Sequence, residues 1–187
     1  MTSKIKELIE EAEKLASEQN FIDALEILEK LFKDNPQSEE TKQSLVKTLF
    51  IYGGYLNDEY ILQYDKAKQL FKRIIEIDPE NYRAHYNLGI ANFNLENMEQ
   101  AKQCYEEAIR IKPDYKHCFY NMGLVYEREG NLQEALKYYE IALDIDPNFP
   151  YAYNARNQIL SNLGRLKKDR KDSRKKQNLE QLKSLLE

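Results

Sequence analysis

Two histidines and two cysteines are the residues of this chain whose chemistry could be most specific. His117, Cys118 and Cys104 would supply three metal ligands if the fold brought them together, because imidazole and thiolate groups bind zinc. The closely spaced cysteine pairs or histidine pairs that are typical of zinc sites do not occur in the sequence. We therefore interpret both cysteines as small packing residues, and we predict no metal and no other cofactor.

Patterns typical of enzymes are also missing from the sequence. There is no glycine-rich phosphate loop, and no nucleophile stands beside an evident base. Carboxylates are abundant, with 32 aspartates and glutamates, but their helical spacing predicts solvated helix faces rather than a catalytic pair. We predict that the protein is not an enzyme.

A pattern suited to binding is formed by tyrosine and asparagine side chains that recur after 34 residues. Tyr86 and Asn87 are matched by Tyr120 and Asn121. A side-chain amide can donate and accept hydrogen bonds at once, which suits the backbone of an extended peptide. Tyrosine adds flat amphipathic surface of the kind that anchors interfaces. The alternative is that both asparagines simply face water.

The same 34-residue period extends over many other positions. Residues 86–89 (Tyr-Asn-Leu-Gly) are followed by residues 120–123 (Tyr-Asn-Met-Gly), and further pairs at this spacing are Ala101 and Ala135, Tyr105 and Tyr139, Ala108 and Ala142, and Pro113 and Pro147. A fixed period of this size is typical of stacked helical hairpins, none of which can bury its apolar face alone.

These residues resemble the tetratricopeptide repeat (TPR). The shared features are a small residue after Leu or Met in a first helix, then alanine and an aromatic residue in a second helix, then Asp-Pro or Lys-Pro. The resemblance covers about residues 5–163 and is strongest over 82–149, with Asn92 at a position where the family usually has an aromatic residue. It implies an all-α, right-handed solenoid of about four helical hairpins, whose first helices line a concave groove for peptides or helices.

The predicted organisation follows the prolines and the period. It comprises a first hairpin (1–38), a second hairpin (39–81), a third (82–115), a fourth (116–149), a capping helix (150–164) and a basic C-terminal extension, helical or disordered (165–187). Pro36 and Pro79 are 43 residues apart, so the second hairpin has an insertion of nine residues, expected near 50–64 where Gly53-Gly54 should interrupt the helix. We expect either a longer first helix with a turn packed by its own tyrosines, or an exposed aromatic loop that binds a partner.

Helix starts are predicted at two asparagines of the regular repeats. Asn97 is followed three residues later by Gln100, and Asn131 is followed by Glu134. This spacing predicts a capping box, in which the two side chains satisfy each other's free backbone groups.

The resemblance also implies which residues line the groove. These are Arg83, Tyr86, Asn87 and Ile90 in the third hairpin, and His117, Tyr120, Asn121 and Leu124 in the fourth. Co-chaperones of the family hold acidic heat-shock-protein tails with a clamp of lysines, an arginine and asparagines. The matching positions here are Gln43, Lys47, Asn87, His117 and Asn121, so most of the cations are missing, and the sequence disfavours this function.

Charge is distributed unevenly along the chain. The net charge is -4, but residues 165–176 alone carry +6, and the body up to residue 164 carries -9. The basic residues of this stretch are Arg165, Lys167, Lys168, Arg170, Lys171, Arg174, Lys175 and Lys176. The extension could be a solvated helix, or it could bind an acidic partner or the acidic body. Nucleic-acid contact is disfavoured, because aromatic residues are not interleaved with the charges.

The sequence therefore predicts a protein-binding scaffold or adaptor. The N-terminus has no apolar signal core, and no stretch is long enough to span a membrane, so the expected location is the cytoplasm, with the nucleus as an alternative because of the basic cluster. The expected partner is a protein or peptide. The alternatives are a fixed subunit of a large assembly, a co-chaperone, or a nucleic-acid-associated factor that binds through its tail.

Overall fold

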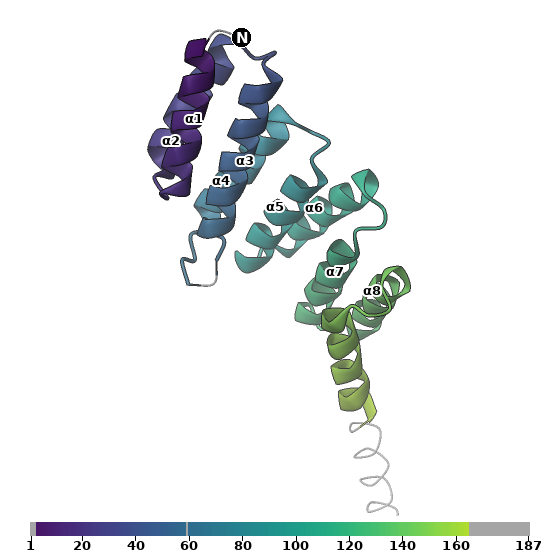
Figure 1. Cartoon of the computed structure of the whole chain (residues 1–187). Coiled ribbons are helices and arrows are strands. Elements are labelled where there is room, and N and C mark those ends of the chain that lie inside the picture. Colours follow the sequence, from purple (N-terminus) through teal and green to yellow (C-terminus); the bar gives the residue numbers. More distant parts are fainter. Residues whose placement is uncertain (1–2, 59, 165–187) are drawn as a thin grey trace, which may run out of the picture. The chain divides into compact units, whose positions relative to one another are not determined.

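The computed structural model describes residues 3–58 and 60–164, and within these residues it contains helices and turns but no strand (Figure 1). The all-α prediction is confirmed. The helices are α1 (Ser3–Ser17), α2 (Phe21–Asp34), α3 (Glu39–Leu56), α4 (Tyr64–Ile77), α5 (Tyr82–Asn94), α6 (Met98–Ile111), α7 (Lys116–Arg128) and α8 (Leu132–Ile145). Residues 150–164 form a further helix.

The chain divides into two compact units, Met1–Cys118 and Phe119–Glu187. In the first unit each helix from α1 to α6 packs against the next one along the chain, and α1 also contacts α3. A continuous core runs through these helices, with Leu28, Leu45 and Phe71 among its fully buried side chains. In the second unit, α8 and the helix over 150–164 share a core that includes Tyr139 and Ile159.

The helices form because their apolar residues recur at helical spacing. In α4, for example, Ala67, Phe71 and Ile74 are buried on one face. The helix ends where the backbone N–H of Asp78 donates to the carbonyl of Ile74, just before Pro79. Proline has no backbone N–H to continue the helix, so the chain turns there.

In three of the hairpins, the first and second helices make close contact at a glycine of the first helix. A Cβ atom built on Gly89 would lie 2.4 Å from the Tyr105 ring, and one built on Gly123 would lie 2.3 Å from the Tyr139 ring. The second hairpin uses the same contact, since a Cβ on Gly53 would lie 2.9 Å from the Phe71 ring. Each aromatic ring of the second helix therefore occupies the space that a side chain would need on the first.

This contact corrects the expectation that Gly53 and Gly54 interrupt the helix. α3 continues through both glycines to Leu56, because the missing side chain at Gly53 makes room for Phe71. α3 has 14 residues before Gly53, whereas α5 has seven before Gly89. Seven of the nine extra residues therefore lengthen the start of α3, and the other two lie between Gly53 and Phe71. The insertion was expected near 50–64, but most of it lies before Gly53.

The turn after α3 is not packed by its own tyrosines. Tyr60 is 84% exposed, and Leu62 is exposed with a positive φ of 55°. Tyr52 and Tyr55 at the end of α3 instead contact Phe21, with ring centroids at 4.8 and 5.9 Å. Binding of a partner by this segment stays a prediction.

Neither predicted capping box forms in full, and one of the two asparagines caps its helix. The side chain of Asn131 accepts a hydrogen bond of 3.4 Å from the backbone N–H of Glu134. The side chain of Glu134 is directed to Lys137, at 2.6 Å, so it takes part in an ion pair on the helix surface. Asn97 makes no side-chain capping bond, so the prediction of a capping box at α6 was wrong. The helix starts all the same, because its buried face is anchored by Ala101, whose backbone N–H donates to the carbonyl of Asn97.

Candidate functional site

An aromatic cluster lies at the junction of α5, α6 and the start of α7 in the first unit. Tyr86 contacts Tyr105 at 6.1 Å between ring centroids, Tyr115 edge-on at 5.1 Å, and His117 at 6.2 Å. Tyr115 also contacts His117 at 5.2 Å. Tyr105 is 1% exposed, whereas Tyr86, Tyr115 and His117 are half-buried.

The second unit contains the same cluster, shifted by 34 residues. Tyr120 contacts Tyr139 at 5.8 Å, Phe149 edge-on at 5.7 Å, and Tyr151 at 5.9 Å. Tyr139 is buried, and its hydroxyl donates a 2.7 Å hydrogen bond to Glu127. Tyr151, at the position of His117, is 63% exposed. We call each set of four rings an aromatic quartet.

Sequence reasoning identified only part of each quartet. It named Tyr86, His117 and Tyr120 as groove residues, but it missed Tyr115 and Tyr151. The available signal was the 34-residue spacing, which also relates Tyr115 to Phe149 and His117 to Tyr151. Tyr115 and Tyr151 follow the prolines that end the second helices. A prediction based on the faces of the first helices does not include these positions.

The asparagine beside each quartet lies on the first helix of its hairpin. The Asn87 side-chain N–H donates a 2.8 Å hydrogen bond to the carbonyl of Arg83, one turn earlier in α5. This bond fixes the orientation of the amide and uses one of its two N–H groups. Asn121 is half-buried at the same position of α7, in the second unit.

The other predicted groove residues differ in their surroundings. Arg83 is exposed; its guanidinium stacks over the Tyr82 ring at 5.8 Å and donates a 3.2 Å hydrogen bond to the Tyr82 hydroxyl. Ile90 is half-buried on α5. Leu124 packs against the core of the second unit, so it contributes more to packing than to an open surface.

The quartets are uncharged at neutral pH. Burial, and then the positive charge of Lys116, lower the pKa of His117 below its ordinary value of 6.5, so the imidazole is neutral. Burial raises the pKa of Tyr115 and of Tyr120, so their hydroxyls stay protonated. Such surfaces can stack on apolar groups and exchange hydrogen bonds, but they offer no fixed charge.

Lys47, the lysine at a position of the co-chaperone clamp, forms an ion pair within the chain. The Lys47 ammonium lies 3.2 Å from the Glu13 carboxylate. An acidic ligand at Lys47 would have to compete with that carboxylate.

The histidines and cysteines do not converge on one site. His85 donates through Nε2 to the carbonyl of Pro79 at 2.9 Å, and Cys104 lies 3.6 Å from the side-chain nitrogen of Asn92. Cys118 is buried, and burial raises the pKa of its thiol to about 12. Over the part of the chain that the structure describes, no three histidine, cysteine or acidic side chains are grouped as metal ligands.

The basic residues predicted to dock an acidic partner, Arg165 to Lys176, lie outside the described residues. Among residues 3–58 and 60–164, no helix has the length and apolar character needed to cross a membrane.

Comparisons with protein families match the repeats directly. Residues 82–115 and 118–149 match one tetratricopeptide-repeat profile, and residues 63–81 match a second. No protein among curated sequences is similar enough to count as a relative.

Solved structures share the fold. A crystal structure of MamA is 26% identical with a TM-score of 0.66, over 88% of this chain and 85% of that one. A second MamA structure is 27% identical with a TM-score of 0.63, over 82% and 84%. The first TPR of Spaghetti (RPAP3), bound to the HSP90 peptide SRMEEVD, is 24% identical with a TM-score of 0.57, over 64% and 93%. These likenesses confirm the predicted helical-repeat solenoid class.

Proposed function

Because this chain carries tetratricopeptide repeats, we propose that it is a non-catalytic adaptor that holds a peptide or helix of another protein against the first helices of its hairpins. The observation that carries this proposal is the aromatic quartet around a half-buried first-helix tyrosine, with an asparagine next to that tyrosine, which occurs once in each unit. A structure with the same fold holds a peptide, which supports a protein-interaction role.

The chemistry of this surface suits a polypeptide ligand. The half-buried rings of Tyr86, Tyr115 and Tyr120 provide apolar area and hydroxyls at a low cost in side-chain entropy. The oriented amide of Asn87 can bond a backbone N–H or C=O of the ligand, whatever side chains the ligand carries. The half-buried rings then favour apolar side chains next to that bonded position.

We propose further that the ligand is not held through a terminal carboxylate. The clamp positions are occupied by Gln43, by Lys47 in its pair with Glu13, and by the neutral His117. The RPAP3 domain binds the acidic peptide SRMEEVD, whereas this chain lacks most of the cations that such a ligand needs.

The test combines Asn87→Ala with Asn121→Ala in the full chain. Proteins captured from the source cell are quantified by mass spectrometry against the unchanged chain, with Asn94→Ala plus Asn154→Ala as the matched control, because both of these asparagines are exposed. We expect the first pair to reduce capture of the main partner about tenfold, which is the loss of about 1.4 kcal/mol, with unchanged helical circular dichroism.

Unchanged capture by the Asn87 and Asn121 variant would show that the amides do not bind the partner. Repeating the capture at low and high salt separates an adaptor from a fixed subunit. A companion that is stoichiometric and resists salt would favour the fixed subunit.

A further inference from the structure

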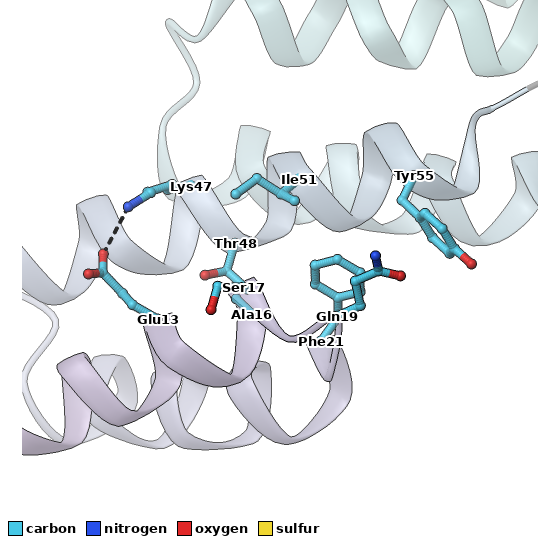
Figure 2. A pocket seen from close by; sticks show the side chains of 9 residues that line it. All are labelled: Glu13, Ala16, Ser17, Gln19, Phe21, Lys47, Thr48, Ile51 and Tyr55. Carbon is cyan, nitrogen blue, oxygen red and sulfur yellow. Dashed lines mark hydrogen bonds and ion pairs between the residues drawn. The ribbon is translucent and has the colours of Figure 1, made fainter.

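A groove runs between α1 and α3 in the first unit, and none of its lining residues belongs to an aromatic quartet. It consists of two adjoining cavities of about 380 and 360 Å³, which share Glu13 and Lys47 as lining residues. Figure 2 shows the first cavity, with Glu13, Ala16 and Ser17 on α1 and Lys47, Thr48 and Ile51 on α3.

One end of the groove is apolar and open. Ile51 and Tyr55 of α3 are 48% and 44% exposed, and they lie across from Phe21 and Gln19 (Figure 2). The Phe21 ring is held by stacking on Tyr52, with interplanar angle 16°. This end is therefore a preformed surface for a bulky apolar side chain, with an ordered aromatic wall.

The other end of the groove is polar with an excess of carboxylates. Glu13 is held by Lys47 at 3.2 Å and by the Ser44 hydroxyl at 3.3 Å, and Glu10 lies 3.9 Å from Lys6. Glu40 is the remaining charge of the lining, and no ion pair within the described residues neutralises it. The first unit as a whole has 22 acidic and 16 basic residues, so its long-range field also attracts cations.

The extra length of α3 builds this polar end. Relative to the glycine contact, α3 begins seven residues earlier than α5, and those residues include Glu40, Gln43 and Ser44 of the lining. On α3 the lining follows one helical stripe, at positions 40, 43, 44, 47, 48, 51 and 55. The insertion thus supplies Glu40, Gln43 and Ser44 of the polar end, whereas Glu10 and Glu13 come from α1.

We propose that the α1–α3 groove binds a basic amphipathic segment of a partner protein. A bulky apolar side chain occupies the end formed by Phe21, Ile51 and Tyr55, and a lysine or arginine lies against Glu40. From position 40 to position 55 the groove is about 22 Å long, at about 1.5 Å per helical residue, so it accommodates a helix of about four turns. This inference rests on the proposed function and deepens it, because α1 and α3 are the first helices of two hairpins, but it involves none of the quartet residues.

The experiment measures binding of fluorescein-labelled 16-residue peptides to the full chain by anisotropy. The first peptide carries leucines on one helical face at one end and lysines on the same face at the other. Two matched peptides replace either the lysines by glutamates or the leucines by serines. We expect the first peptide to bind at least about tenfold more tightly than either of the others.

Variants of the full chain locate the binding site. Ile51→Ser with Tyr55→Ser should weaken the lysine peptide about tenfold. Glu40→Lys should reverse the preference, so that the glutamate peptide binds more tightly. Leu160→Ser is the matched control, because Leu160 is 49% exposed in the second unit, and it should change nothing.

Several results would overturn the proposal. Equal binding of the lysine and glutamate peptides would remove the charge argument, and an unaffected Ile51 and Tyr55 variant would place binding elsewhere. Tighter binding after Lys167, Lys168, Arg170 and Lys171 are changed to Gln would assign the groove to the chain's own extension. A dimer in sedimentation that Ile51→Ser abolishes would assign it to a second copy. Because Asn87→Ala and Asn121→Ala leave this groove unchanged, failure here is separate from failure of the proposed function.

Discussion

Replacing Gly89 by Ala tests the contact on which the hairpins are built. The added Cβ would lie 2.4 Å from Cε1 and 2.6 Å from Cδ1 of Tyr105, whereas ordinary carbon contacts lie at about 3.5–4.0 Å. Tyr105 is 1% exposed and surrounded by core, so its ring cannot move aside without disturbing its neighbours. Overpacking of this kind costs about 1–3 kcal/mol.

The gain in helix propensity works against this cost. Alanine is favoured over glycine in a helix by about 1 kcal/mol, so Gly89→Ala should destabilise the chain by about 1 kcal/mol net, with Gly123→Ala behaving alike. Gly54→Ala is the matched control, because Gly54 lies in α3 and a Cβ there meets nothing within 4 Å. It should stabilise the chain by about 0.5–1 kcal/mol.

Urea unfolding followed by far-UV circular dichroism measures both effects, and it suits a chain without tryptophan. The difference between the two variants isolates the contact from the propensity. If Gly89→Ala and Gly54→Ala shifted the unfolding midpoint alike, the Tyr105 contact would not limit the approach of the helices. Combining Gly89→Ala with Tyr105→Leu should make the two changes less than additive, since the smaller side chain leaves room for the Cβ.

Three further predictions concern buried polar groups and charges. Asn92→Leu should stabilise the chain by about 1 kcal/mol in urea unfolding, because it removes a buried side-chain oxygen for which the described residues provide no hydrogen-bond partner; a destabilised variant would contradict this. The pKa of His117 is lowered in the folded chain, so the unfolded chain takes up its proton first, and stability should fall as the pH drops through 6.5 and below. The melting temperature of His117→Gln should therefore fall less than that of the unchanged chain between about pH 7.5 and 5. The Arg73 guanidinium of α4 donates hydrogen bonds of 2.8 and 2.7 Å to the Glu29 carboxylate of α2. A double-mutant cycle with Arg73→Ala and Glu29→Ala should give a coupling free energy of about 1 kcal/mol in unfolding. A coupling free energy near zero would show that the pair is too solvated to stabilise the fold.

The regular part of the fold could be predicted because its determinants are local and repeated. Gly89 and Tyr105 are spaced as Gly123 and Tyr139 are, so one contact observed twice fixes how two helices pair. The cap at Asn97 could not be predicted, because its sequence is as favourable as that at Asn131. Side-chain orientation at a helix start depends on neighbouring groups that the repeat does not specify.

The candidate sites were predictable to a different extent. The resemblance identified Tyr86 and Tyr120 because they lie on first helices, but the rings that complete the quartets follow the prolines between hairpins. Sequence comparison named Gln43 and Lys47 of the α1–α3 groove, but it could not predict the exposure of Ile51 and Tyr55, which depends on how α1 and α3 pack against each other. Leu45 and Leu49, which are equally apolar and lie in the same helix, are buried instead.

The position of the insertion explains how α3 could be extended without loss of its packing. Seven residues make almost two full turns, so an added heptad shifts the faces of a helix by only about 20°. The buried face therefore continues in phase from Gly53 back to Leu45 and Thr41. The open face also continues in phase, from Ile51 back to Glu40, which adds a polar wall in line with an apolar one. Because the added residues precede Gly53 in one continuous helix, their faces are set by their distance from Gly53, and Glu40 lies on the face of Ile51 because about three turns separate the two residues. The extension therefore adds groove wall toward the start of α3 and leaves the side chains that follow it facing α1.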